Sequence, residues 1–170
     1  MQSLDGYDEL YRSHFARVLR LCRLLLRDRD EAEDVAQEVF VAALREWRGV
    51  EKRMAWGPWL TTVAVHACHR RRQGKWWQWW RSATEALATE HLAGVARTGE
   101  ENMADAQLRT VLLQTFRSLS HRQREVFVLR HVEGWSSQEV ADTLGVTVGS
   151  VKRHLFRATE AFRKVLGTRR

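Results

Sequence analysis

Apolar residues recur at helical spacing along most of the 170-residue chain, and no stretch alternates as a half-buried strand does. The spacing predicts helices over residues 5–27, over residues 31–47, from Pro58 to Arg72, from Ala104 to Leu119, and from Ser120 to near Gly134. Asp28 to Asp30 break the first pair, and Ser120 with Gln123 forms a capping box. We therefore expect an all-α fold.

The helical period is interrupted once over a long stretch. Residues 81–107 lack strong periodicity, are rich in Ala, Thr, Gly and acidic residues, and contain Gly94 and Gly99 as breaks. This composition is typical of a linker between domains. We predict two small helical domains, residues 1–80 and 108–170, joined by residues 81–107.

The stretch from Glu133 to Lys164 predicts two helices separated by a tight turn. Ser136 or Ser137 caps the first helix, Gly145 supplies the positive φ of the turn, and Thr147 caps the second. The apolar stripe of the second helix is Val148, Val151, Leu155, Ala158 and Phe162. Its opposite face carries Ser150, Lys152, Arg153, His154 and Arg157. An ordinary helical hairpin with a solvated face is the plain alternative, but the combination favours a DNA-binding helix-turn-helix.

Charge is distributed unevenly along the chain. The net charge is +7 and the pI is about 10.2. Residues 1–80 carry +3, residues 81–107 carry −3 and residues 108–170 carry +7, with 12 Lys and Arg against 5 Asp and Glu in the last segment. A basic C-terminal third favours a polyanionic partner.

Two cysteines, Cys22 and Cys68, lie within apolar helical patterns. This spacing makes neither a zinc ribbon nor a disulfide framework, so buried free thiols are expected. The N-terminus MQSLDGYDEL does not resemble a signal peptide and no long apolar run follows. We expect a cytoplasmic protein without direct membrane insertion.

An acidic strip marks the outer face of the second predicted helix. Its members are Glu31, Glu33, Asp34, Gln37 and Glu38, with no basic residue before Arg45. Acidic residues early in a helix suit the helix dipole, so part of the strip can serve stability alone. The strip nevertheless extends past the first turn, which is also typical of a surface for a basic partner protein. The residues alone leave both interpretations open.

The third predicted helix ends in a basic run followed by an aromatic one. His69, Arg70, Arg71 and Arg72 precede the run Trp76–Trp80. Cations that hold phosphates beside aromatic rings that stack on bases are typical of single-strand binding, although solvated arginines and packed tryptophans are the plain alternative. His66, Cys68 and His69 do not share a helix face at metal-ligand spacing, so no metal or other cofactor is expected.

Three blocks in this order resemble RNA polymerase sigma factors of the extracytoplasmic-function type, which keep only sigma domains 2 and 4. The blocks are RDRDEAEDVAQEVFVAALR, WLTTVAVHACHRRR and LSHRQREVFVLRHVEGWSSQEVADTLGVTVGSVKRHLFRATEAF. The resemblance implies a domain 2 that binds core RNA polymerase and melts the −10 element, and a domain 4 that reads −35 duplex DNA. It also implies that residues 48–57 form the loop that captures a base flipped out of the −10 duplex.

The resemblance assigns roles to individual residues. The expected core polymerase contacts are Glu33, Asp34, Gln37 and Glu38. The expected −10 contacts are Trp59, His66, His69, Arg70, Arg71 and Arg72. The expected −35 contacts are Thr147, Ser150, Lys152, Arg153, Phe156 and Arg157.

Some positions depart from the family pattern. The family often has Asn at the position of His66 and Ser at that of Arg153. The segment RGVEKRMAWG matches its usual loop poorly, and the run WWQWW is not part of its pattern. For Phe156, partial burial in the domain core is an alternative to DNA contact. The tryptophan run is expected to pack between the domains or against an anti-sigma protein.

The sequence thus predicts a promoter-specificity subunit that is not an enzyme. Its partners are core RNA polymerase, promoter DNA and an anti-sigma factor. A stand-alone helix-turn-helix regulator is the alternative, but it leaves the acidic strip and the basic third helix without a role. A compact free form, with the acidic residues 81–107 across a basic face, is a further hypothesis.

Overall fold

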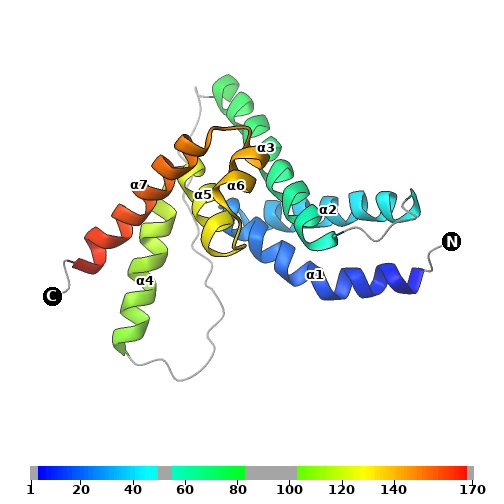
Figure 1. Ribbon diagram of the computed structural model, residues 1–170, viewed down its shortest axis with the longest axis horizontal. Helices are drawn as coiled ribbons and strands as arrows, with labels where there is room; N and C mark the ends of the chain where they lie inside the picture. Colours follow the sequence, from blue (N-terminus) through cyan, green and yellow to red (C-terminus); the bar gives the residue numbers. More distant parts are fainter. Residues whose placement is uncertain (1–3, 50–54, 83–102, 168–170) are drawn as a thin grey trace. The chain divides into compact units, whose positions relative to one another are not determined.

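The computed structural model describes residues 4–49, 55–82 and 103–167, and across these residues every regular element is a helix (Figure 1). The helices are α1 (Leu4–Leu25), α2 (Arg29–Gly49), α3 (Trp56–Ser82), α4 (Met103–Ser118), α5 (His121–His131), α6 (Ser137–Leu144) and α7 (Val148–Gly167). The all-α prediction is confirmed. None of the helices in the described residues is both long enough and apolar enough to cross a membrane.

The chain divides into two compact units, Met1–Trp80 and Arg81–Arg170. The first contains α1, α2 and most of α3, and the second contains α4 to α7. Most of the predicted linker, residues 83–102, lies outside the described residues, as do residues 50–54 of the predicted capture loop. Each unit is therefore described by itself.

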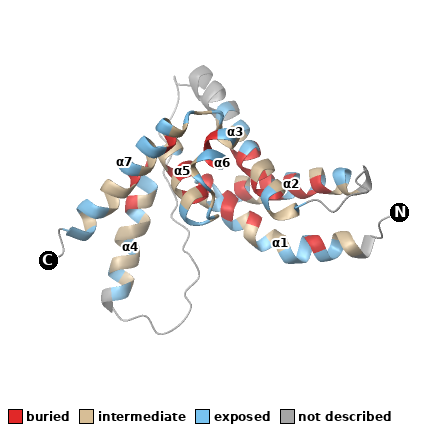
Figure 2. Cartoon of the chain, viewed as in Figure 1, coloured by how far each residue is buried: buried red, intermediate tan, exposed pale blue. Residues whose placement is uncertain are grey.

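In the N-terminal unit α1 packs against α2, and a short polar cap separates them. The Asp28 carboxylate Oδ1 accepts hydrogen bonds from the backbone N–H groups of Asp30, at 2.9 Å, and Glu31, at 3.0 Å. A side-chain acceptor satisfies N–H groups that have no partner inside the helix, so α2 starts here. The buried core, red in Figure 2, comes from all three helices. It includes Val18, Leu21, Cys22, Leu25, Val35, Ala36, Val39, Phe40, Ala43, Leu60, Ala64, Val65 and Cys68.

Arg17 of α1 contacts the start of α3. The guanidinium of Arg17 donates to the hydroxyl of Thr61 at 2.8 Å and to the carbonyl of Gly57 at 2.9 Å. Thr61 is itself 1% exposed. The contact fixes the first turn of α3, where Pro58 is tolerated because its missing N–H needs no helical partner.

Helix α3 continues well beyond its predicted end at Arg72 and closes at Ser82. The prediction ended the helix before Gly74, but a single glycine costs only about 1 kcal/mol in a helix interior. The residues that follow include no proline, so the backbone stays helical through the run Trp76–Trp80. The side chains of that run lie outside the described residues.

In the C-terminal unit, α4, α5 and α6 all pack on α7. The Ser120 capping box is confirmed, because its hydroxyl accepts from the N–H of Gln123 and the Gln123 side chain accepts from the N–H of Ser120. The core residues are Leu119, Val126, Val128, Leu129, Val140, Ala141, Val151 and Ala158. Helix α7 therefore supplies the buried stripe around which this unit forms.

Two charged residues of α5 are buried in this unit. Arg124 is 2% exposed, and its guanidinium donates to the carbonyls of Arg117, at 3.1 Å, and Leu119, at 3.3 Å, beside the ring of Phe116. It thereby satisfies carbonyls at the C-terminal end of α4. Glu125 is 1% exposed and accepts from Arg122 at 3.0 Å. A buried charge is tolerated where it is paired in this way.

Candidate nucleic-acid interface

The turn between α6 and α7 has the geometry that the sequence predicts. Ser136 caps α6 in a capping box with Glu139, and these hydrogen bonds lower the pKa of the Glu139 carboxyl. Gly145 ends α6 with φ 64° and ψ 40°, a left-handed conformation that favours glycine. The Thr147 hydroxyl then accepts from the N–H of Ser150 at 3.1 Å and begins α7. The helix-turn-helix prediction holds in its cap, turn and helix order.

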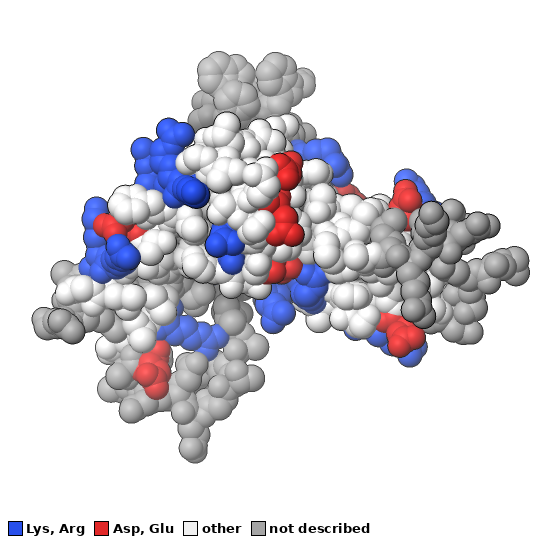
Figure 3. Space-filling model, in the orientation of Figure 1, with Lys and Arg blue, Asp and Glu red and all other residues white. Residues whose placement is uncertain are grey.

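The outward face of α7 is exposed and ordered by its own side chains. The Thr147 hydroxyl donates to the Ser150 hydroxyl at 3.1 Å, and Arg153 donates to the same Ser150 oxygen at 3.3 Å. The exposed members of the face are Thr147, Lys152, Arg153, Phe156 and Arg157, while Ser150 is half-buried. Lys and Arg side chains gather along α7 in Figure 3. The face presents hydroxyl and guanidinium donors from one helix end, as groove reading requires.

Phe156 points out of the core rather than into it. Its exposed fraction is 63%, the largest among the exposed large apolar side chains of the described residues. The alternative of partial burial is therefore not what the structure shows. An exposed phenyl ring on a basic helix face is suited to contact with a thymine methyl group.

His154 was expected on the outward face, and the structure corrects this. The residue is half-buried, and its Nδ1 atom is buried without a hydrogen-bond partner. It lies three residues after Val151 and four before Ala158, which places it at the edge of the buried stripe. Burial, followed by the charges of Arg122, Arg153 and Arg157, lowers its pKa, while Glu125 acts in the opposite sense.

In the acidic strip of α2, Asp34, Gln37 and Glu38 are exposed and Glu31 and Glu33 are half-buried, and three of its carboxylates are paired within the N-terminal unit. Glu33 accepts from Arg23 of α1 at 2.6 Å. Arg71 of α3 lies 2.5 Å from Glu38 and 3.7 Å from Asp34, so one guanidinium bridges two carboxylates on successive turns. The sequence showed no basic partner four residues away, because both partners come from other helices.

The basic run of α3 separates into three different environments. Arg70 is exposed, Arg71 faces the acidic strip, and Arg72 donates to the carbonyl of Leu25, the last residue of α1, at 3.4 Å. His69 contacts Arg72 through Nδ1 at 3.3 Å and Gln73 through Nε2 at 2.8 Å. The three consecutive arginines therefore do not form one cationic surface in this structure.

Trp59, expected to face the −10 DNA, belongs to an aromatic cluster. Its ring is 5.4 Å from that of Trp56, which is 5.4 Å from Trp47, which is in turn 6.1 Å from Tyr7. The Nε1 atom of Trp47 is buried without a partner. The cluster lies at the start of α3 and is half-buried. His66, further along the same helix, is exposed. Trp59 is therefore held in a half-buried aromatic cluster rather than standing free on the surface.

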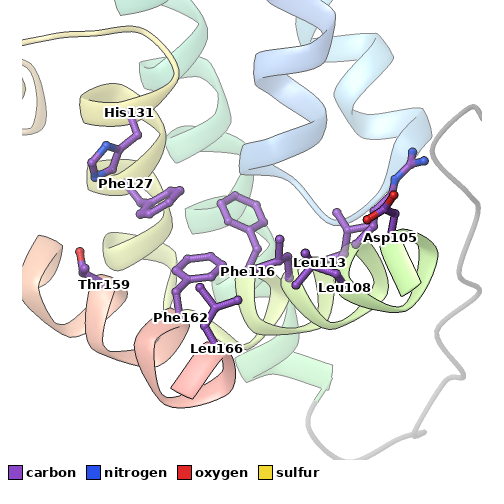
Figure 4. A pocket seen from close by; sticks show the side chains of 11 residues that line it. Asp105, Leu108, Leu113, Phe116, Phe127, His131, Thr159, Phe162 and Leu166 are labelled. Carbon is purple, nitrogen blue, oxygen red and sulfur yellow. The ribbon is translucent and has the colours of Figure 1, made fainter. Parts of the chain in front are cut away.

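An apolar groove opens in the C-terminal unit between α4, α5 and α7 (Figure 4). Its volume is about 640 Å³. It is lined by Asp105, Leu108, Arg109, Leu112, Leu113, Phe116, Phe127, His131, Thr159, Phe162 and Leu166. Phe127 of α5 stacks on Phe162 of α7 with ring centroids 5.0 Å apart, and both rings line the groove. No sequence motif predicted the groove, because its lining residues come from three different helices.

Among the described residues, no group of three or more His, Cys, Asp and Glu side chains lies close enough together to hold a metal ion. Cys22 and Cys68 are buried free thiols, as predicted. The ring nitrogens of His69 are instead engaged with side chains on its own helix.

Comparisons with known proteins match both units to sigma factors. Residues 10–78 match the family model "Sigma-70 region 2", and residues 109–161 match "Sigma-70, region 4". The chain is 33% identical to the RNA polymerase sigma-E factor of Streptomyces avermitilis, over 96% of this chain and 86% of the relative. It is 30% identical to the ECF RNA polymerase sigma factor SigM of Mycobacterium tuberculosis, over 95% of this chain and 78% of the relative.

A solved structure supports the same fold. The sigma factor RpoE from Bartonella quintana, in complex with the anti-sigma factor NepR, superimposes with a TM-score of 0.72 at 19% identity. The match covers 97% of this chain and 99% of that one. Together with the sequence relatives, it establishes that the chain belongs to the extracytoplasmic-function (ECF) family of RNA polymerase sigma factors and consists of sigma-70 regions 2 and 4.

Proposed function

We propose that the region-4 unit reads −35 duplex DNA with the outward face of α7. In the same proposal the region-2 unit binds core RNA polymerase through α2 and holds the opened −10 strand with α3. As a member of its family the chain is a transcription initiation factor and not an enzyme. It acts where the polymerase acts, in the cytoplasm. The observation that carries the proposal is the outward face at the start of α7, where hydrogen bonds link the side chains of Thr147, Ser150 and Arg153.

The N-terminal turn of α7 is suited to a major groove for two reasons. Backbone N–H groups at a helix start favour phosphate oxygens, and Arg or Lys donors reach the O6 and N7 acceptors of guanine. Arg153 is held by Ser150, so part of its rotamer entropy is already lost before DNA arrives. Lys152 and Arg157 add exposed charge on the same face. We assign Thr147, Ser150 and Phe156 to the same contact.

The −35 assignment is tested by the salt dependence of duplex binding. Replacing Lys152 by Gln should weaken binding and reduce the slope of log affinity against log salt by about 0.9, the value of one phosphate contact. The matched control is Lys164→Gln, an exposed lysine near the other end of α7. Equal slopes for both variants would remove Lys152 from the interface.

For region 2 we propose that Arg70 and His66, both exposed on α3, contact the opened −10 strand. Trp59 and His69 would flank them, and Arg72 holds the end of α1 from the same helix. A base that has left the duplex loses stacking worth a few kcal/mol, and nearby cations and ring edges offset that loss. The residues of the capture loop itself lie outside the described ranges.

The polymerase assignment is tested by binding of the purified chain to core enzyme. The double variant Asp34→Arg, Glu38→Arg should abolish tight binding, because it reverses the two exposed charges of the strip that also contains Glu33 and Gln37. Asp8→Arg with Glu9→Arg makes the same change in net charge on α1 and should bind normally. If wild type binds duplex DNA but not core enzyme, the chain is a stand-alone regulator instead.

We also propose that an anti-sigma protein covers the apolar groove of region 4. Two observations support this: seven of the eleven side chains that line the groove are apolar, and a protein of the same fold was solved in complex with an anti-sigma factor. Leu166 lines the groove and is 47% exposed, while Val132 is 51% exposed and does not line it. Leu166→Asp should weaken co-purification with a candidate anti-sigma protein, and Val132→Asp should not.

A further inference from the structure

One residue of α3 belongs to both surfaces assigned to region 2. Arg71 stands among the expected −10 contacts, yet its guanidinium lies 2.5 Å from Glu38 and 3.7 Å from Asp34, which are expected polymerase contacts. Its neighbours in sequence behave differently, since Arg70 is exposed and Arg72 binds the end of α1. Arg71 is therefore the point at which the two surfaces meet.

The pairing has two effects on a phosphate that approaches Arg71. The Glu38 carboxylate occupies a guanidinium N–H donor that would otherwise be available to the strand. The two negative charges of Asp34 and Glu38 also repel a phosphate at short range, where screening is weak. As long as no partner protein binds Asp34 and Glu38, Arg71 is therefore a poor phosphate ligand.

The same ion pair is easily exchanged. The side chains of Asp34 and Glu38 are 64% and 56% exposed, and that of Arg71 is 29% exposed. Ion pairs between side chains this exposed contribute little to stability, because water solvates the separated charges well. A basic protein surface that engages Asp34 and Glu38 can therefore displace Arg71 without disturbing the helices.

We propose that Arg71 is an exchangeable phosphate contact, held on the acidic strip of α2 in the free protein and released to the opened DNA strand when a partner occupies that strip. The inference rests on the proposed function, which supplies the two surfaces. It adds a coupling between them: occupation of the α2 face strengthens single-strand binding on α3, and by reciprocity the strand strengthens occupation of the α2 face.

The coupling is measurable in the full-length free protein, without polymerase. Asp34→Asn with Glu38→Gln removes the competing carboxylates and should raise affinity for a short fluorescein-labelled single-stranded DNA about two- to five-fold, the worth of an exposed ion pair. The salt slope should steepen by about 0.7, because one more phosphate contact forms on a single strand. Adding Arg71→Gln to this variant should remove both gains.

A matched control separates release of Arg71 from a simple change in net charge. Asp8→Asn with Glu9→Gln removes two exposed negative charges from α1 and should leave the salt slope unchanged. The inference is overturned if this control raises affinity as much as Asp34→Asn with Glu38→Gln does, or if Arg71→Gln fails to cancel the gain.

Arg70→Gln distinguishes failure of the inference from failure of the proposed function. In the wild-type background it should weaken single-strand binding and flatten the salt slope. If it does so while Asp34→Asn with Glu38→Gln changes nothing, the −10 surface stands and the exchange is wrong. If Arg70→Gln is also without effect, the −10 assignment on α3 fails, and the exchange fails with it.

Discussion

The charged side chains on the proposed binding surfaces of regions 2 and 4 are arranged differently. In region 2, arginines link helices to one another in addition to the apolar core: Arg17 contacts α3 from α1, Arg23 contacts α2 from α1, and Arg71 contacts α2 from α3. In region 4 the cross-helix arginine is the buried Arg124, while Arg153 on the outward face of α7 is exposed. The proposed binding surface therefore shares residues with the cross-helix contacts in region 2, whereas in region 4 the two sets are separate.

This difference bears on how each region tolerates change. A substitution on the outward face of α7 is expected to alter binding and leave the packing of the unit intact. In region 2, a substitution at Arg17 is expected to alter packing, whereas one at Arg71, whose ion pairs are exposed, is expected to alter mainly the surface shared by α2 and α3. Effects of the second kind are expected to be non-additive, because the residues share partners.

The largest effect is expected from Arg17→Met in region 2. The change leaves the Thr61 hydroxyl and the Gly57 carbonyl without their charged donor. Loss of these two hydrogen bonds should lower the free energy of unfolding by about 2–4 kcal/mol in total. Urea unfolding followed by circular dichroism measures the loss. Arg20→Met, an exposed arginine one turn along α1, should change stability little; equal losses would mean that the tie between α1 and α3 is not structural.

The next effect concerns binding by region 4. Arg153→Glu should weaken −35 duplex binding by about 1–3 kcal/mol, the range of a good base contact, with stability unchanged because the side chain is exposed. Fluorescence anisotropy measures the affinity and thermal unfolding the stability. A loss of stability comparable to that of Arg17→Met would contradict the separation of tasks on α7.

A smaller effect is expected at the turn of the helix-turn-helix. Gly145→Ala forces a Cβ into a left-handed backbone and should cost about 1–2 kcal/mol, although no atom lies within 4 Å of the added group. Gly149→Ala, in the first turn of α7, meets only the Thr147 hydroxyl at 3.8 Å and should stabilise by up to about 1 kcal/mol. Amide hydrogen exchange in α7 measures both the loss of stability in Gly145→Ala and the gain in Gly149→Ala.

The smallest effect is a dependence of stability on pH. Burial and nearby arginines lower the pKa of His154, and burial with Arg17 lowers that of His14. The unfolded chain therefore binds more protons below its ordinary histidine pKa of about 6.5, so stability falls as the pH drops through that value. His154→Gln should flatten the pH profile of hydrogen exchange in region 4 and leave that of region 2 unchanged. An unaltered profile in region 4 would mean that His154 titrates normally.

The sequence predicted region 4 more completely than region 2, for a physical reason. Ser136, Gly145 and Thr147 act within a few residues of themselves, so caps and turn are visible in local spacing. The partners of Glu38 and Thr61 come from other helices, 33 and 44 residues away, and no local pattern reports them. Helix type was therefore predictable, whereas the pairing of Arg71 with Glu38 and Asp34 was not.

Two errors of prediction show where local rules give way. The third helix was predicted to end at Arg72, but it continues through Gly74 to Ser82, because one glycine is only a mild cost in a helix interior. Placing His154 outward treated a polar side chain as an exposed one, although its position beside Val151 decides its surroundings. Arg122 and Glu125 pair at a spacing of three residues on one helix, but the burial of Glu125 is not visible in that spacing.

The two buried thiols give region 2 an intrinsic probe of core opening that region 4 lacks. Cys22 and Cys68 are the chain's only cysteines, both are 0% exposed, and they lie on different helices of one core. A thiol reagent can reach either only when that core opens, so its labelling rate counts opening events of region 2 alone. Labelling in the presence of core polymerase or single-stranded DNA would then report, without any engineered probe, how strongly each partner holds this core closed.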